Sequence, residues 1–295
     1  MVGRGWPFHN DGDPDDWAHD AASVSLHHTL TMAPQQLAVA VYDIAATSLP
    51  SAALVLAAAL SIFAAALVRG FTGFGFALTA VPLLGLFMPP TQSVPVAVCL
   101  QLLIGLGDLP RASRVCDWPS LRWLILGGVI GSPIGVLVLS LVSASAARLL
   151  IALITVGAVV LLNAGFRLTT APARRITALV GLTAGMFNGL AGMPGPPVIV
   201  YYNSGAFGRI AARASMMVFF LVSSIVATAT LASFDLLDLH VAVLTALGIP
   251  VMLVGTWLGD LGFHRGSDTL HRRVSMTSLA AVALGSALKG LSDLL

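Results

Sequence analysis

Long stretches without a charged side chain are the feature that most limits what this chain can fold into. A helix needs about 20 apolar residues to cross the hydrocarbon core of a bilayer. Only 9% of the 295 residues are charged and 57% are hydrophobic, whereas soluble domains carry about 25% charged residues. We therefore exclude a water-soluble globule and predict an all-α polytopic membrane protein. The uncharged stretches are 44–68, 70–107, 123–147, 149–166, 176–208, 214–234, 239–259 and 274–288.

The stretch 70–107 is too long for one crossing at about 1.5 Å per residue. It opens with a glycine-rich run, RGFTGFG at Arg69–Gly75, followed by an apolar leg from Phe76 to Met88. We expect a break in the helix at this run. Irregular backbone at membrane depth is tolerated only where protein or a water-filled cavity satisfies its polar groups.

The stretch 176–208 has the same problem of length. Its interruption is GLAGMPGPP at Gly189–Pro197, and the legs beside it, 176–188 and 198–207, are each too short to cross a bilayer. We expect this element to be a re-entrant hairpin.

The chain also repeats itself. GSPIG at Gly131–Gly135 recurs as GTWLG at Gly255–Gly259, and Arg148 recurs as Arg272, both 124 residues later. Each half then holds one broken element and three transmembrane helices, about eight transmembrane segments in all. At a slightly shorter offset, the broken elements match Gly70, Gly73 and Pro82 with Gly185, Gly189 and Pro197.

The arginines predict how the chain crosses the membrane, because short cytoplasmic loops hold an excess of Lys and Arg. The arginine-bearing loops 109–122, 166–175 and 262–273 are predicted inside, and the loops 142–147 and 234–239 outside. The first broken element then enters from outside and the second from inside. Two similar halves of opposite orientation form an inverted-topology repeat, in which substrate sites lie near the midplane between discontinuous helices. The predicted repeats are 35–168 and 169–295.

The N-terminal segment 1–34 differs from the rest, because it is acidic, polar and without a membrane-spanning run. We predict a flexible solvated tail that is neither a secretory signal nor a metal site, and Met32 is an alternative start to Met1. The net charge of +2 does not favour a nucleic-acid partner. Cys99 and Cys116 are predicted to be free thiols, and no cofactor or metal is predicted.

Two motifs carry a resemblance to a known family. They are RGFTGFGFALTAVPLL at Arg69–Leu84 and GMFNGLAGMPGPPVIVYY at Gly185–Tyr202. They resemble the sulfite exporter TauE/SafE family of membrane transporters, whose two repeats each open with a glycine-rich motif that ends in proline. The resemblance covers about residues 50–292 and implies a small anionic substrate such as sulfite or an organosulfonate. Phe74 and Phe76 stand where the family tends to have more glycine, which predicts a narrower or more apolar pocket.

The second legs of the broken elements are expected to begin near Phe76 and Val198, deep in the membrane, with their N-termini converging. A helix N-terminus offers unpaired N–H donors and about half a positive charge, and glycine lets an anion approach the backbone. The alternative is that the glycines only permit close helix packing. The glycines predicted to bind are Gly70, Gly73, Gly75, Gly189, Gly192 and Gly195.

Arg69 has two interpretations, since a buried arginine is costly unless it is paired or faces water. It either belongs to the binding site or reaches the cytoplasmic headgroups as an interfacial anchor. Tyr201 and Tyr202 are interpreted as interface anchors. Further polar candidates for the site, each with the alternative of a helix contact, are Thr72, Gln101, Asn188 and Asn203.

The function predicted from these features is a secondary transporter, an exporter of small oxyanions in the cytoplasmic membrane. No serine-hydrolase or P-loop motif occurs. Three alternatives stay open: a membrane-embedded enzyme acting on a lipid-linked substrate, an importer of carboxylates or sulfonates with the same fold, and an assembly subunit. The expected partners are the anion and the lipid bilayer, and a homo-oligomer is left open. The acidic residues after Ile44 are expected at window edges, in loops or near the C-terminus, so coupling through a side-chain proton is not favoured.

Overall fold

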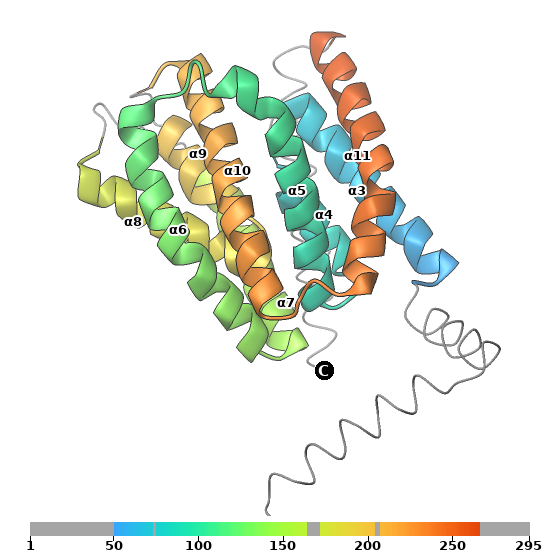
Figure 1. The fold of residues 1–295 in the computed structure, drawn as a ribbon. Helices are drawn as coiled ribbons and strands as arrows, with labels where there is room; N and C mark the ends of the chain where they lie inside the picture. The colour runs from blue at the N-terminus through green and yellow to red at the C-terminus, as the bar shows by residue number, and fades with distance from the viewer. Residues whose placement is uncertain (1–49, 73–74, 164–171, 204–206, 266–295) are drawn as a thin grey trace, which may run out of the picture. The chain divides into compact units, whose positions relative to one another are not determined.

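A computed structural model describes residues 50–72, 75–163, 172–203 and 207–265. The acidic tail 1–34 and the predicted crossing at 274–288 lie outside these residues. Figure 1 shows the arrangement of the helices. They are α3 (Ala52–Thr72), α4 (Phe76–Leu84), α5 (Pro90–Ala112), α6 (Trp118–Leu141), α7 (Ala144–Asn163), α8 (Arg174–Ala191), α9 (Gly195–Asn203), α10 (Arg209–Ser233) and α11 (Leu239–Arg265).

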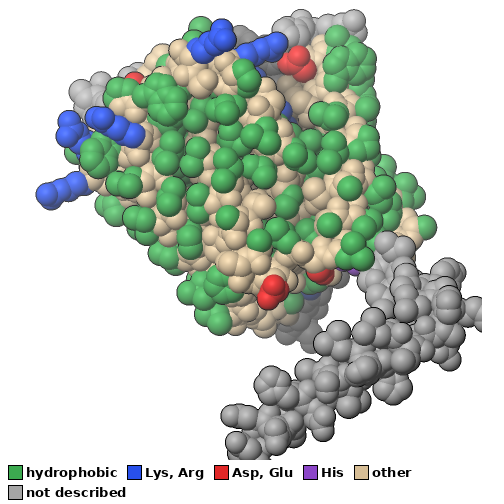
Figure 2. All heavy atoms as spheres, in the orientation of Figure 1, with side chains coloured by type: hydrophobic (Ala, Val, Ile, Leu, Met, Phe, Trp, Pro, Cys, Tyr) green, Lys and Arg blue, Asp and Glu red, His purple; other side chains and the backbone are tan. Residues whose placement is uncertain are grey.

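The helical membrane class is confirmed, because all regular structure in the described part is helix and five of its helices are long and apolar enough to cross a bilayer. In the view of Figure 2, Lys and Arg side chains gather along the upper edge and upper left, while hydrophobic side chains cover the middle. The five spans are Ala52–Gly70, Pro90–Ala112, Trp118–Leu141, Ile210–Ser233 and Leu239–Leu261.

Two helices are too short to cross, and each follows a break. α4 and α9 have nine residues each, or about 13 Å at 1.5 Å per residue. Gly75 caps the start of α4 with φ 88°, and Gly192 ends α8 with φ 66°. Both values lie in the left-handed region, which only glycine adopts without strain.

The first legs of the broken elements are longer than the sequence suggested. The expected leg 176–188 is wrong, because α8 has 18 residues and is about 27 Å long. α3 likewise continues through Arg69 and Gly70 to Thr72. An interior glycine costs a helix about 1 kcal/mol relative to alanine, and here close helix packing compensates for that cost.

Glycines hold α6 and α8 together at backbone distance. A Cβ added to Gly131 would overlap the carbonyl oxygen of Leu182, and one added to Gly185 would overlap the oxygen of Gly128. Small residues four apart allow this approach in membrane helices. The glycines whose added Cβ would overlap the other helix are Gly127, Gly131 and Gly135 on α6, and Gly181, Gly185 and Gly189 on α8.

The helices pack in pairs that are far apart in sequence. α6 packs on α8, α3 on α11, and α5 on α10. Figure 1 shows α5 and α10 side by side, with α3 and α11 to one side of them and α6 and α8 to the other. The broken elements therefore each have one full-length partner helix, and the α5–α10 pair lies between the two groups.

The helices α3, α4 and α5 each have a bound that recurs 119 residues later in α8, α9 and α10. α4 and α9 begin 119 apart, as do α5 and α10, and α3 and α8 end 119 apart. These bounds place Gly70 opposite Gly189, one helical turn from the match of Gly70 with Gly185 that the sequence predicts. The glycines of α8 recur every four residues, and for this reason a shift of one turn matched the sequence pattern equally well.

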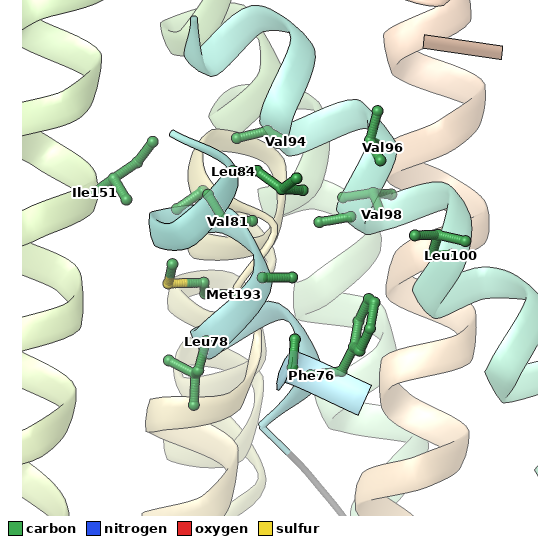
Figure 3. Close-up of a cluster of buried hydrophobic side chains, with 14 of the residues drawn as sticks. Phe76, Leu78, Val81, Leu84, Val94, Val96, Val98, Leu100, Ile151 and Met193 are labelled. Carbon is green, nitrogen blue, oxygen red and sulfur yellow. The ribbon is translucent and has the colours of Figure 1, made fainter. Parts of the chain in front are cut away.

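A hydrophobic cluster encloses α4. Figure 3 shows its side chains Phe76, Leu78, Val81 and Leu84 among Val94–Leu100 of α5. Met193, from the second break, and Ile151 of α7 belong to the same cluster. Each residue of α4 except Leu83 is buried. Protein rather than lipid therefore surrounds this half-length helix.

Candidate functional site

A small cavity lies where the two breaks meet. Its walls come from the start of α4, one face of α5, the second break and α10. The volume open to the centre of a water molecule is about 40 Å³, room for roughly three waters at about 10–15 Å³ each. The lining residues are Arg69, Gly75–Leu78, Gln101, Ile104, Gly105, Asp108, Met193–Gly195, Ile199, Met217 and Phe220.

An ion pair forms part of the cavity wall. Arg69, in the last turn of α3, donates to the carboxylate of Asp108 on α5. The Arg69 side chain is 14% exposed and that of Asp108 31%. A largely buried charged side chain is costly without such a partner. The structure thus places Arg69 in the cavity wall, in keeping with the site interpretation.

Asp108 was not among the predicted site residues, because the sequence places it at the edge of the uncharged stretch 70–107. α5 continues one turn beyond it to Ala112, so Asp108 lies inside the helix. A signal was available, however. Arg69 and Asp108 are the two charges that bound the uncharged stretch 70–107, and they are opposite in sign.

Gln101 and Asp108 lie on the same face of α5, together with Gly105. Positions separated by three, four and seven residues share one helix face. The Gln101 amide donates from Nε2 to Oγ of Ser224 on α10, at 3.0 Å. Because this bond holds the amide in place, the Gln101 side chain can present its remaining hydrogen-bonding groups to the cavity.

Both half-length helices begin at the cavity. In α4 the first intrahelical bond runs from the amide of Thr79 to the carbonyl of Gly75, 3.1 Å, so the earlier amides of the first turn have no partner within the helix. α9 begins at Gly195, earlier than the expected Val198. The residues that start both helices line one cavity, and their positive dipole ends favour an anion there.

Other predicted site residues make helix contacts outside the cavity wall. Gly70 packs against the backbone of α11 and Gly189 against that of α6. Asn188, fully buried, donates to the carbonyl oxygen of Ser223 on α10, at 2.9 Å. Gly192 lies beside Val81 and Val98. Their positions match the packing alternative, and a binding role for them stays a prediction.

Three predicted residues cannot be placed in the site. Gly73 lies outside the described residues. Thr72 ends α3 and Asn203 ends α9, and only their backbones are described. The structure therefore brings together Arg69, Gly75, Gln101 and Gly195 from the predicted set.

The prediction that Tyr201 and Tyr202 anchor the chain at the membrane interface is wrong. They are 4% and 1% exposed. The hydroxyl of Tyr201 pairs with that of Thr177 on α8 and the hydroxyl of Tyr202 with that of Ser120 on α6, both at 3.0 Å. Tyrosine suits a membrane belt and a buried site with a polar partner equally well, so the sequence could not separate the two.

A family model described as "Sulfite exporter TauE/SafE" matches residues 57–286. The chain belongs to the sulfite exporter TauE/SafE family. It is 29% identical over 229 residues to a Cupriavidus necator protein named "Probable sulfite/organosulfonate exporter TauE", covering 75% of this chain and 89% of that protein. No solved structure matches the chain. The family is one of membrane transporters, so this TauE/SafE member is a multi-pass membrane transporter and not an enzyme.

Proposed function

We propose that this TauE/SafE member is a secondary transporter that exports a small oxyanion, such as sulfite or an organosulfonate, across the cytoplasmic membrane. One observation carries the proposal. A single small cavity combines a guanidinium, a side-chain amide and the starts of two half-length helices. These are the donors that an oxyanion requires, and the name of the Cupriavidus necator relative supports the same substrate class.

We infer that the chain consists of two inverted repeats, 35–168 and 169–295. The packing pairs support this, because α3 on α11 and α8 on α6 are the same contact with the repeats exchanged. Matching glycines support it too. Gly70 approaches Thr256, Gly259 and Asp260 of α11. Gly189 approaches Ser132, Gly135 and Val136 of α6, and these three residues lie 124 positions before the three on α11.

Charged side chains at the helix ends indicate the orientation in the membrane. The guanidinium carbons of Arg122 and Arg174 both lie 5.8 Å from the ring centroid of Trp123, so the starts of α6 and α8 share one end of the bundle. Asp235 and Asp238 lie in the turn between α10 and α11. By the positive-inside rule we assign the arginine-bearing end to the cytoplasm.

In this arrangement the anion enters beside Arg69 and Asp108 and reaches Gln101 and the two helix starts. The cluster around α4 closes the path beyond. Movement of α4 and α9 relative to their partner helices would then open the opposite side, as in alternating access around a fixed midplane site.

The test is flux with the purified protein in lipid vesicles. Labelled sulfite, sulfoacetate, thiosulfate, sulfate and short carboxylates are compared, with empty vesicles and Arg69→Gln protein as references. We expect saturable flux of sulfite or an organosulfonate that Arg69→Gln weakens. Flux of carboxylates alone would support the importer alternative, and absence of flux for every anion would refute the proposal.

A further inference from the structure

We propose that Asp108 is a built-in competitor of the transported anion: its carboxylate occupies Arg69 in the empty site, and the anion binds by displacing it. This inference rests on the proposed function. Asp108 then sets the affinity for the anion, and the Arg69–Asp108 contact is exchangeable.

The ion pair spans two helices that otherwise make little contact. α3 packs on α4 and α11, and α5 packs on α10, α11 and α4, whereas α3 and α5 are not among the described pairs that pack closely. Arg69 and Asp108 meet at the cavity wall. Separating their side chains therefore disturbs little of the apolar packing between helices.

Charge balance favours the exchange. Arg69 and Asp108 are the charged residues of the described cavity wall, and they cancel. Arg213 on α10 adds positive potential at Arg69. A second anion beside an intact pair would meet the like charge of Asp108. An anion that takes the place of the carboxylate keeps the guanidinium paired, because the planar fork of the guanidinium donates to a carboxylate and to an oxyanion in the same way.

The exposures of the two side chains favour release of the carboxylate. Asp108 is 31% exposed, so it can turn into water, while Arg69 is 14% exposed and stays at the cavity. A displaced carboxylate is then solvated rather than buried without a partner, which would be costly. The group that leaves is the one that water can reach.

The second half of the chain provides a comparison that argues against a purely structural pair. At the offset of 119 residues, Asn188 corresponds to Arg69 and Ala227 to Asp108. There, α8 is tied to α10 by the neutral bond from Asn188 to the Ser223 carbonyl. A link between the first and third helices of a half therefore needs no charge, so the charged pair requires a different reason.

The experiment measures anion flux of Asp108→Asn protein in vesicles, with KM and maximal rate determined separately. Because the amide competes weakly for Arg69, KM should fall about fivefold, corresponding to ~1 kcal/mol, and Asp108→Glu should stay near the wild-type KM. The matched control is Asp235→Asn, which removes the same charge at a turn residue with φ 55°, a conformation that asparagine tolerates. It should leave KM unchanged.

A second measurement uses the wild-type protein and does not depend on the variant folding. A water-soluble carbodiimide with an amine nucleophile modifies accessible carboxylates, and mass spectrometry reads the extent at Asp108. Sulfite should increase modification at Asp108 and leave that at Asp235 unchanged. Decreased or unchanged modification would overturn the inference.

The two proposals fail in different ways. Wild-type flux together with an unchanged or raised KM in folded Asp108→Asn protein overturns the competitor role alone. Wild-type protein that moves none of the anions overturns the proposed function, and this inference with it.

Discussion

At the scale of single residues, the glycines of the two motifs divide into two groups. Gly70 and Gly189 leave room for the backbone of another helix, whereas Gly75 and Gly195 line the cavity. Gly70 and Gly189 lie inside α3 and α8, whereas Gly75 precedes α4 and Gly195 begins α9. Substitutions should therefore have different consequences. We expect loss of the fold at Gly70 and Gly189, and loss of anion binding at Gly75 and Gly195.

Gly195→Val tests the binding group. An added Cβ would lie 3.2 Å from Cδ1 of Ile199 and 3.5 Å from Cδ1 of Leu78, which are side-chain ends able to shift. We expect normal folding and flux lowered by about tenfold or more, because the new side chain fills the space of the anion. Gly107→Val on α5 is the control, since an added Cβ there meets nothing within 4 Å. Equal flux in both variants would contradict the placement of the site.

Tyr202→Phe tests the buried tyrosine pair. The change removes the hydrogen bond to Ser120 and should lower the free energy of unfolding by ~1 kcal/mol. Thermal unfolding in detergent measures it, and a double-mutant cycle with Ser120→Ala isolates the pair. Strictly additive effects would show that this bond contributes no stability.

At the scale of elements, α6 and α8 supply the sharpest stability test. Gly131→Val should prevent a stable fold, because its Cβ would overlap the carbonyl oxygen of Leu182 and rigid helix backbones cannot both move away. We expect little protein in the membrane and no cooperative unfolding transition. Gly157→Val on α7 is the control, with open space around the added Cβ. Similar yields of the two variants would contradict the packing.

Much at this scale was predictable from charge alone. The stretch 214–234 corresponds to α10 and 239–259 to α11, because a lipid-facing helix must keep charges near its ends. The ends of α3 and α8 were not predictable. A helix passes through Gly70 or Gly189 only because a partner helix lies against it, and local sequence holds no record of that partner. The Arg69–Asp108 pair was missed for another reason: Asp108 was assigned to the edge of an uncharged stretch, whereas it lies inside α5.

At the scale of the whole molecule, the assigned orientation can be tested with thiols. Cys116 lies between α5 and α6 at the end assigned to the cytoplasm, and Cys99 and Cys116 are both free, as predicted. Partial burial raises the pKa of the Cys116 thiol. Since the thiolate reacts, labelling should accelerate as pH rises and needs mildly alkaline buffer. A membrane-impermeant maleimide should label Cys116 in inverted vesicles and not in intact cells. The reverse pattern would invert the assigned orientation.

The driving force also belongs to the whole molecule. The acidic residue at the cavity, Asp108, lies one turn from the end of α5 and is paired with Arg69. A proton relay needs a carboxylate within the membrane, whereas Asp108 lies near the end of its helix. The pair leaves the empty site neutral, so an anion that enters carries its own charge across. With a negative interior, each negative charge moved outward is favoured by about 2.3 kcal/mol per 100 mV.

We therefore predict electrogenic export that follows membrane potential more than the pH gradient. Vesicles loaded with labelled sulfite are given a potassium–valinomycin potential at equal pH, and a pH step at zero potential is applied to a second sample. Efflux should increase with a potential that is negative inside and respond weakly to the pH step. Asp235→Asn protein, altered far from the ion pair along the chain, should behave as wild type. Efflux that ignores the potential and follows the pH step would instead indicate proton symport or a protonated substrate such as bisulfite, with Asp108 as the first carboxylate to test as its relay.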